Sequence, residues 1–420
     1  MPDTSASSFT ALFLVALGIS VAIRVWLASR QIRHVRACRE HVPAEFAGRI
    51  APDAHRKAAD YTVAKVRFGF VALATETLLL LALTLGGGID TLAAAWQSRW
   101  PGLTAGLGLI FSVMLISAAV DLPLAGWRQF VIEERFGFNR MTPRLFLTDM
   151  LKSAALAAII GTPVILVVLW LMAAMGQYWW LHVWLFWCAF NLLILFIYPT
   201  WIAPLFNKFE PLAAGEVRDR VEALLARCGF QSDGLFVMDG SKRSAHGNAY
   251  FTGFGKSKRI VFFDTLLKRL QAAEIEAVLA HELGHFRHRH VVKRIVTMFG
   301  LALLFLAALG QLIAAPWFYA GLGVTTEAPG TAVALVLFFL AMPAFVFPLT
   351  PLGSMLSRRH EFEADRYAAQ HASGEALVHA LVKLYEDNAA TLTPDPLHSL
   401  FYDSHPPAAI RIAHLKAVAA

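Results

Sequence analysis

Long apolar stretches recur along the chain, with polar and basic segments between them. A helix needs about 20 consecutive apolar residues to cross the hydrocarbon core of a bilayer. We expect the first stretch to be a span rather than a cleaved signal peptide, because residues 1–8 contain no basic residue and no clear cleavage site follows. The pattern predicts seven membrane-spanning helices, at residues 9–29, 68–88, 102–125, 153–176, 179–203, 294–322 and 331–353.

The region between the fifth and sixth predicted spans has a mixed pattern. Helical spacing over Gly215–Phe230 is followed by three short strand-like segments, at Gly234–Met238, Asn248–Gly253 and Arg259–Phe263. A further helix is expected over Ala272–His290, which contains no proline. The fold class predicted is a mainly α-helical, polytopic membrane protein that carries an α+β cap. Its parts are spans one to five at 1–205, the α+β insert at 206–293, spans six and seven at 294–355, and a C-terminal segment at 356–420.

Composition and charge agree with this class. Of 420 residues, 57% are hydrophobic and 16% are charged, which excludes an ordinary soluble domain. Lys and Arg gather at residues 30–67 and 128–144, whereas the predicted second loop holds only Arg99. Because cytoplasmic loops hold the excess of basic residues, we expect the N-terminus outside and the insert and C-terminus in the cytoplasm. The net charge of +7 then reflects loops that contact anionic lipid, and it indicates no nucleic-acid binding.

The segment LAHELGHFRHRH contains an HExxH motif formed by His281, Glu282 and His285. Residues four apart lie on one face of a helix, so both imidazoles can reach one ion while Glu282 lies beside a metal-bound water. The motif predicts a zinc peptidase. A chance match without metal is the alternative, and the apolar helical spacing of Ile275 and Leu279 favours the peptidase.

A catalytic zinc takes three protein ligands, so a third should lie elsewhere in the chain. The best candidate is Glu361, because Asp365 follows it by one helical turn and can orient a ligand histidine. Glu363 is an alternative ligand. The competing interpretation is a solvated charged helix, since the surrounding segment mixes both signs of charge.

Other polar residues have plainer interpretations. His288 and His290 belong to an RHRH run that is typical of a basic cluster at a membrane boundary. Arg24 and Glu76 lie inside predicted spans, where they either line a cavity or pair between helices. The three cysteines have no paired spacing, which argues against a disulfide framework or a thiolate metal site; they are Cys38, Cys188 and Cys228.

Beyond HExxH, blocks of sequence resemble the type I CAAX prenyl endopeptidases, a family of integral-membrane zinc metalloproteases. They occur in the family's order between Asp121 and Arg411. The blocks are VIEERFGFN at Val131–Asn139, APLFNKFEPL at Ala203–Leu212, SKRSAHGNAYFTG at Ser241–Gly253, FFDTL at Phe262–Leu266, SRRHEFEAD at Ser357–Asp365 and SHPP at Ser404–Pro407.

The resemblance implies seven helices around a water-filled chamber, with a zinc site that faces it from the cytoplasmic cap. It implies one Zn²⁺ ion per chain on His281, His285 and Glu361, with Glu282 as general base and Asp365 supporting a ligand histidine. His405 is similar to the family histidine that stabilises the oxyanion, and the resemblance places Arg411 at the same site. The plainer alternatives are that His405 caps a turn before two prolines and that Arg411 pairs with acidic neighbours. The residues that resemble the family's substrate-pairing strand include Asn248, Ala249 and Tyr250.

The implied activity is endoproteolysis by a zinc-activated water, with the ability to remove the last three residues of prenylated CAAX peptides. A general quality-control metalloprotease of the membrane is the nearer alternative, although it would have fewer spans. A non-enzymatic transporter is the more distant one. The Ala- and Arg-rich composition is typical of bacteria, so an inner-membrane location is expected. A monomer is also expected, and the physiological substrate is left open.

Overall fold

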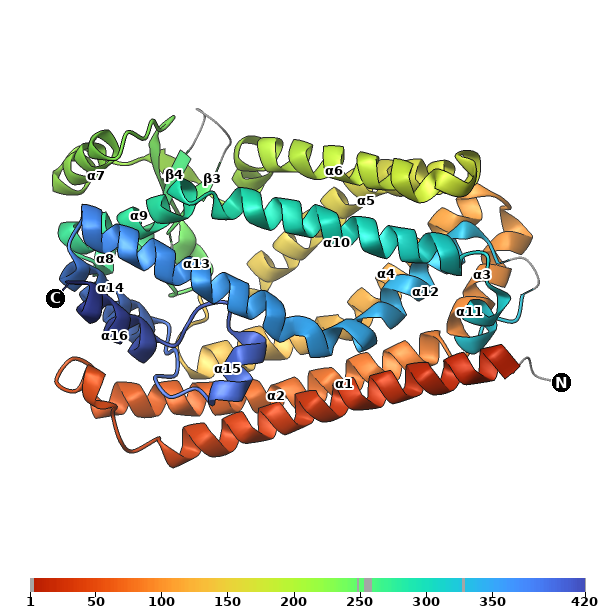
Figure 1. The fold of residues 1–420 in the computed structure, drawn as a ribbon, viewed down its shortest axis with the longest axis horizontal. Coiled ribbons are helices and arrows are strands. Elements are labelled where there is room, and N and C mark those ends of the chain that lie inside the picture. Colours follow the sequence, from red (N-terminus) through yellow and green to blue (C-terminus); the bar gives the residue numbers. More distant parts are fainter. Residues whose placement is uncertain (1–3, 248, 253–258, 327–328, 420) are drawn as a thin grey trace.

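The computed structural model describes residues 4–247, 249–252, 259–326 and 329–419, and long helices dominate it (Figure 1). The seven predicted spans are confirmed, although most of the helices run past the predicted ends. The described segments long and apolar enough to cross a membrane are Thr4–Ala37, Pro52–Leu83, Leu103–Glu133, Pro143–Ala174, Gly176–Leu205, His290–Leu312 and Thr331–His371.

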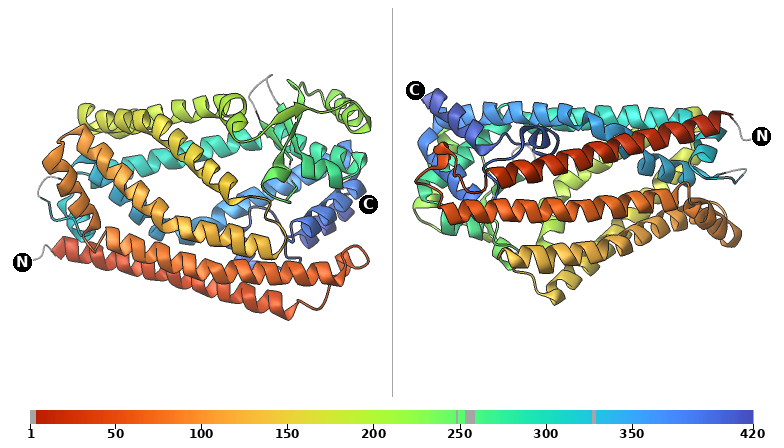
Figure 2. Two further views of the ribbon diagram at one scale, coloured as in Figure 1. Left: turned by 180° about the vertical axis from the view of Figure 1, so that it is seen from behind. Right: turned by 90° about the horizontal axis from the view of Figure 1, so that it is seen from below.

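The membrane helices are arranged lengthwise, with the N-terminus at one end and the C-terminus at the other (Figures 1 and 2). Helices α1 and α2 run side by side along one side of the molecule. The last span is broken by a 3₁₀ turn at Phe347–Leu349, where a proline at position 348 interrupts the backbone hydrogen bonds. The spans comprise α1 (Thr4–Ala37), α2 (Pro52–Leu83), α4 (Leu103–Trp127), α5 (Pro143–Ala174), α6 (Trp179–Ile197), α10 (His290–Leu312), α12 (Thr331–Val346) and α13 (Thr350–His371).

At the end of the molecule that carries the N-terminus, one predicted boundary is wrong and one expected loop contains a helix. The sixth span stops at Leu312, and the rest of the predicted stretch forms a separate helix, α11 (Pro316–Gly321), because Pro316 favours the first position of a new helix. A helix, α3 (Gly88–Arg99), also occupies the expected second loop. It packs on α4, where Trp96 Nε1 donates to Ser112 Oγ over 2.9 Å.

The cap contains a four-stranded sheet of order β1-β2-β4-β3. Strands β2 and β4 are parallel and the other pairs are antiparallel, which leaves β3 at one edge of the sheet. The three predicted strands are present, but β1 was missed because three residues ending in proline show no alternation. The strands are β1 (Phe209–Pro211), β2 (Leu235–Met238), β3 (Ala249–Thr252) and β4 (Arg259–Phe263).

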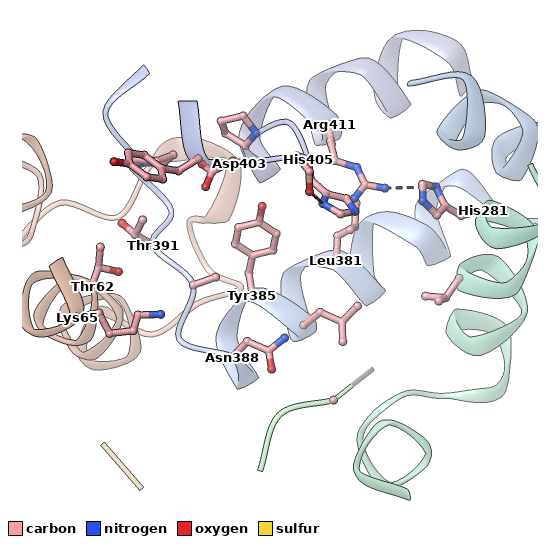
Figure 3. Close-up of a pocket in the computed structure, with 18 of the residues that line it drawn as sticks. Thr62, Lys65, His281, Leu381, Tyr385, Asn388, Thr391, Asp403, His405 and Arg411 are labelled. Atoms are coloured by element: carbon pink, nitrogen blue, oxygen red, sulfur yellow. Dashed lines mark hydrogen bonds between the residues drawn. The ribbon is translucent and has the colours of Figure 1, made fainter. Parts of the chain in front are cut away.

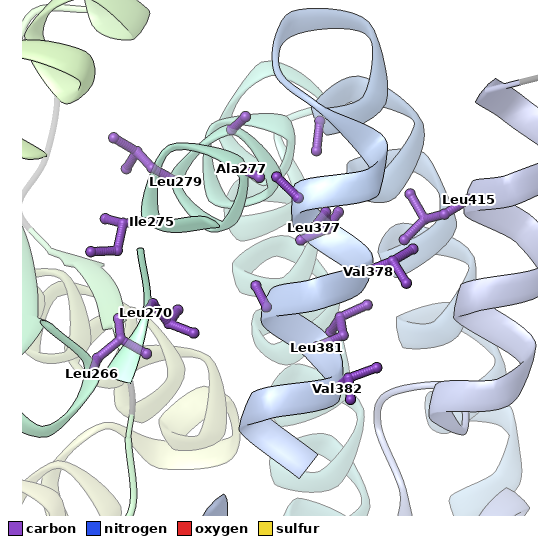
Figure 4. Close-up of a cluster of buried hydrophobic side chains, with 14 of the residues drawn as sticks. Leu266, Leu270, Ile275, Ala277, Leu279, Leu377, Val378, Leu381, Val382 and Leu415 are labelled. Carbon is purple, nitrogen blue, oxygen red and sulfur yellow. The ribbon is translucent and has the colours of Figure 1, made fainter. Parts of the chain in front are cut away.

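One apolar core joins the sheet to the cap helices (Figure 4). Ile275 and Leu279 of α9 (Ala272–Arg287) face Leu266 and Leu270. Leu377 and Leu381 of α14 (Gly374–Asp387) pack against α9. Burying such side chains stabilises the cap by about 1.5–3 kcal/mol for each large residue. The cap helices are α7 (Glu216–Arg227), α8 (Asp264–Arg269), α9 (Ala272–Arg287), α14 (Gly374–Asp387), α15 (Pro396–Tyr402) and α16 (Ala408–Ala419).

Polar contacts fasten the cap to the membrane helices. Asn139, which follows α4, pairs with Ser244 in an isolated β-bridge. The guanidinium of Arg243 donates to Asp149 of α5 over 2.8 Å and also to the Asn207 side chain over 2.7 Å. These contacts join three of the family-like blocks, which are far apart in the sequence.

The intramembrane charges fit both earlier interpretations. Arg24 Nη1 lies 3.9 Å from Glu76 Oε2, so the two helices α1 and α2 carry a loose pair. Both residues also line a cavity of about 380 Å³, to which Asp121 of α4 contributes. A second, more apolar cavity of about 870 Å³ lies among α5, α6, α10, α12 and α13.

Candidate metal centre

The HExxH motif lies on α9, as its spacing predicts. The helix starts with a capping box, in which Gln271 and Glu274 satisfy each other's backbone N–H groups. Leu283 is buried in the cap core, and this fixes the rotation of α9. His281 and His285 consequently lie on one face, with their Nε2 atoms 3.2 Å apart.

Helix α13 crosses α9 closely enough to bring a carboxylate to this histidine pair. Gly284 makes the approach possible, because a Cβ at this position would lie 2.9 Å from Ala364 Cα. Glu361 is one turn before Ala364 on the same helix and is buried. Its carboxylate oxygens lie 3.4 Å from His281 Nε2 and 3.4 Å from His285 Nε2.

These three side chains form a group that can hold a metal ion among the residues described. Glu361 Oε2 is buried and has no hydrogen-bond partner, so the site leaves a ligand atom unsatisfied. Burial opposes a charge on His281, yet the carboxylates of Asp365 and Glu361 raise the pKa of its imidazole to about 9. The surroundings therefore stabilise a positive charge at this position.

Asp365 and Arg411 fix the orientation of His281. Asp365 Oδ1 lies 2.9 Å from His281 Nδ1, which leaves Nε2 pointing to the centre of the site. Arg411 of α16 donates from Nε to Asp365 Oδ2 over 2.9 Å, and its Nη1 lies 3.6 Å from Glu361 Oε2. Arg411 thus both pairs with acidic neighbours and lies at the site.

His285 is oriented by a residue that the sequence interpretation assigned elsewhere. Its Nδ1 lies 2.9 Å from Nδ1 of His290, and His290 Nε2 lies 2.9 Å from Glu363 Oε2. His290 is buried and stacks on His360 with ring centroids 4.0 Å apart. Its assignment to an interfacial basic cluster is wrong, and the Glu363 side chain contacts His290 instead of the candidate metal group.

Comparison with known proteins decides what this arrangement belongs to. The family model described as CAAX prenyl protease N-terminal, five membrane helices, matches residues 31–208, and the model of peptidase family M48 matches residues 211–419. The chain belongs to peptidase family M48. It is therefore an integral, multi-pass membrane metalloendopeptidase, and the interpretation as a non-enzymatic transporter is excluded.

Relatives of known name agree with this assignment. The CAAX prenyl protease 1 of Saccharomyces cerevisiae is 39% identical over 325 residues, which cover 74% of this chain and 71% of that protein. The CAAX prenyl protease 1 homolog of Homo sapiens is 31% identical over 96% of this chain and 95% of its own length. The crystal structure of S. mikatae Ste24p matches with a TM-score of 0.90 and 31% identity, over 97% of this chain and 99% of that one.

The candidate metal centre opens into a cavity of about 640 Å³ (Figure 3). His281, Glu282, His405 and Arg411 line it. His405 Nε2 lies 3.3 Å from Glu361 Oε1, while Ser404 Oγ lies 2.9 Å from His405 Nδ1. Glu282 and His405, predicted as catalytic from far-apart segments, thus line the same cavity as the candidate ligand His281.

The residues predicted to bind substrate divide into three groups. Ala249 and Arg411 line the cavity. The Tyr250 ring points elsewhere, toward Phe263 and a small pocket beside Tyr198, since successive residues of a strand face opposite sides. Asn248 lies outside the described residues.

Sequence reasoning missed several residues of this cavity. Thr62 and Lys65 reach it from α2, whereas Tyr385 and Asn388 come from the end of α14. The sequence places Lys65 among the basic residues of a loop, where its charge serves topology. No short motif links these residues to HExxH, so only the packing of α2 and α14 against the cap could reveal them.

Proposed function

We propose that this peptidase holds one Zn²⁺ ion on His281, His285 and Glu361. Ligand atoms about 2.0–2.1 Å from a tetrahedral zinc lie roughly 3.3–3.4 Å from one another. The two Nε2 atoms are 3.2 Å apart, and each lies 3.4 Å from one Glu361 oxygen, Oε2 for His281 and Oε1 for His285, which is close to that geometry. Two imidazoles and a carboxylate are also a donor set of catalytic zinc sites, which keep a fourth position for water. This convergence of ligands beside the open cavity is the observation that carries the proposal.

The side chains around the centre have complementary chemical roles. A bound zinc ion lowers the pKa of a coordinated water toward neutrality and polarises a substrate carbonyl. Glu282 accepts the proton of the attacking water and passes it to the leaving amine. His405 donates a hydrogen bond from Nε2 to the oxygen on which negative charge develops, since the Ser404 hydroxyl can donate to Nδ1. Asp365 and Arg411 keep Nε2 of His281 directed at the metal.

The proposed reaction is removal of the last three residues from CAAX peptides, including prenylated ones. The names of the relatives support this substrate class. Strand β3 supports an extended binding mode, because it is at the edge of the sheet and Ala249 lines the cavity. An extended peptide adds to such an edge through main-chain hydrogen bonds, which tolerate many side chains.

The cap, with its metal centre, is proposed to face the cytoplasm, and the protein to act as a monomer in the bacterial inner membrane. The loop between α1 and α2, within the basic segment 30–67, lies at the same end of the molecule as the cap, which supports the orientation (Figure 1). A cysteine introduced at Thr326, near the opposite end, should react with an impermeant thiol reagent in intact cells. Cys38 should react only after lysis, and the reverse result would invert the assigned orientation.

The activity is tested with purified protein and matched peptides. Farnesylated and unmodified CAAX peptides are incubated with the enzyme, with and without a chelator, and the products are identified by mass spectrometry. We expect loss of the C-terminal tripeptide, abolished by the chelator and restored by zinc. Absence of a chelator-sensitive product from both peptides would refute the activity. Comparison of the two peptides shows whether the prenyl group is required.

A further inference from the structure

Charged and polar side chains line the cavity beside the metal centre at two widely separated places (Figure 3). His281, His405 and Arg411 lie at one end. Lys65 and Thr62 lie at the opposite end in this view, and Asn388 is also remote from His281. Leu381 and Tyr385 lie between these ends in the same view. The aliphatic side chains that line the cavity include Val278, Leu377, Leu381 and Leu384.

The ammonium of Lys65 has no direct ion-pair partner among the described residues. It lies 4.0 Å from the centroid of the Tyr61 ring, a cation–π contact that leaves its N–H donors available. The nearby carboxylate of Glu133 accepts a hydrogen bond from Tyr61 Oη over 2.6 Å and lies 3.7 Å from His246 Nε2. Asp403 also lines the cavity, and no ion pair joins it to Lys65 within the part of the chain described.

Arg411 is the other basic side chain of Lys or Arg that lines the cavity, and its charge is already paired. Arg411 is buried and makes charge-assisted hydrogen bonds to Asp365. An anionic substrate group would therefore have to break a buried ion pair at Arg411. This costs several kcal/mol, because a buried charge is left without its partner. At Lys65 no such pair has to be broken. Among the described lining residues, Lys65 is thus the cation suited to receive a carboxylate.

We propose that Lys65, assisted by the Thr62 hydroxyl and the Asn388 amide, binds the C-terminal carboxylate of the substrate. The inference rests on the proposed function, in which the cut lies three residues from the end. An extended tripeptide spans about 10 Å, so a cation at a fixed distance from the metal selects the bond to be cut. Aliphatic side chains of the lining, such as Leu381, receive the side chains of the released residues.

The test compares a farnesylated CAAX peptide with a free C-terminal carboxylate and the same peptide with a C-terminal amide. Wild-type enzyme should cleave the acid with a kcat/KM roughly ten- to hundredfold higher, as expected for a hydrogen bond to a charged group. Lys65→Gln should raise KM for the acid and lose this preference, so that the variant cleaves the acid and the amide with similar kcat/KM. Lys65→Arg should retain it.

Lys57 provides a matched control. It lies two turns earlier on α2 and also contacts an aromatic ring, that of Phe138, at 4.7 Å, but it does not line the cavity. Lys57→Gln should therefore keep the wild-type preference for the acid. Equal cleavage of acid and amide by wild-type enzyme, or an unchanged preference in Lys65→Gln, would overturn the proposal.

A binding measurement separates this inference from the proposed activity. Fluorescently labelled tripeptides with a C-terminal carboxylate or a C-terminal amide are titrated into the zinc-loaded Glu282→Gln protein. This binding measurement requires no turnover. Tighter binding of the acid that disappears with Lys65→Gln supports the carboxylate site even if no peptide is cleaved. Equal binding of both tripeptides refutes the site even if cleavage is observed.

Discussion

The Nδ1 atoms of His285 and His290 lie 2.9 Å apart, and Nε2 of His290 lies 2.9 Å from Glu363. One of the two facing Nδ1 atoms carries a proton, so each ring fixes the orientation of the other. This chain of contacts directs Nε2 of His285 to the metal centre, as Asp365 does for His281. Both histidines of HExxH therefore have a carboxylate-linked partner, although only one partner is apparent from the motif spacing.

His290→Phe should weaken zinc binding because it keeps a ring against His360 but removes the hydrogen bond to His285. Loss of such an outer contact typically costs 10–100-fold in metal affinity. The affinity is measured by competition with a chromogenic chelator. His288→Phe, at an exposed position, is the control and should bind zinc as the wild type does. Equal affinities for the two variants would remove His290 from the metal site.

Glu282→Gln should retain one zinc ion per chain and lose peptide cleavage. The amide cannot accept the proton of the attacking water, whereas it has nearly the same shape as the carboxylate. Zinc content by mass spectrometry and tripeptide release are measured on the same preparation. Cleavage at the wild-type rate by this variant would show that another group is the base.

Glu361→Gln and Glu363→Gln distinguish the two candidate third ligands. Glu361→Gln should lower the zinc content strongly, because it removes the anionic ligand that lies 3.4 Å from both histidines. Glu363→Gln should keep the metal with a moderately lower affinity, since it acts only through His290. The opposite ranking in a zinc assay would make Glu363 the ligand.

Gly284→Ala should disturb the crossing of α9 and α13, because the new Cβ would lie 2.9 Å from Ala364 Cα. Overpacking of this kind costs about 1–3 kcal/mol of stability. We expect a lower midpoint of thermal unfolding in detergent and a lower zinc content. Gly300→Ala is the control, since a Cβ there meets no atom within 4 Å. If both variants unfold alike, close packing at Gly284 has no special role.

The sequence by itself determined the parts whose signals are local. Apolar runs of membrane length fixed the seven spans, because a bilayer leaves no other way to bury them. HExxH places two imidazoles one helical turn apart, so His281 and His285 converge whatever surrounds them. Three of the four short strands of the cap were also identifiable from their sequence, and β1 was not.

Only the tertiary structure decided how distant segments meet. The close approach at Gly284 brings Glu361 to the histidine pair, and its tightness depends on the absence of a side chain on one helix. The sequence suggests a surface charge for His290, whereas in the structure it is a buried partner of His285, because α13 covers it with His360 against its ring. The sequence places Lys65 among the basic residues that set membrane topology, whereas in the structure it lines the cavity because α2 lies beside the cap. Such contacts are set by packing across the chain, and no spacing within one segment encodes them.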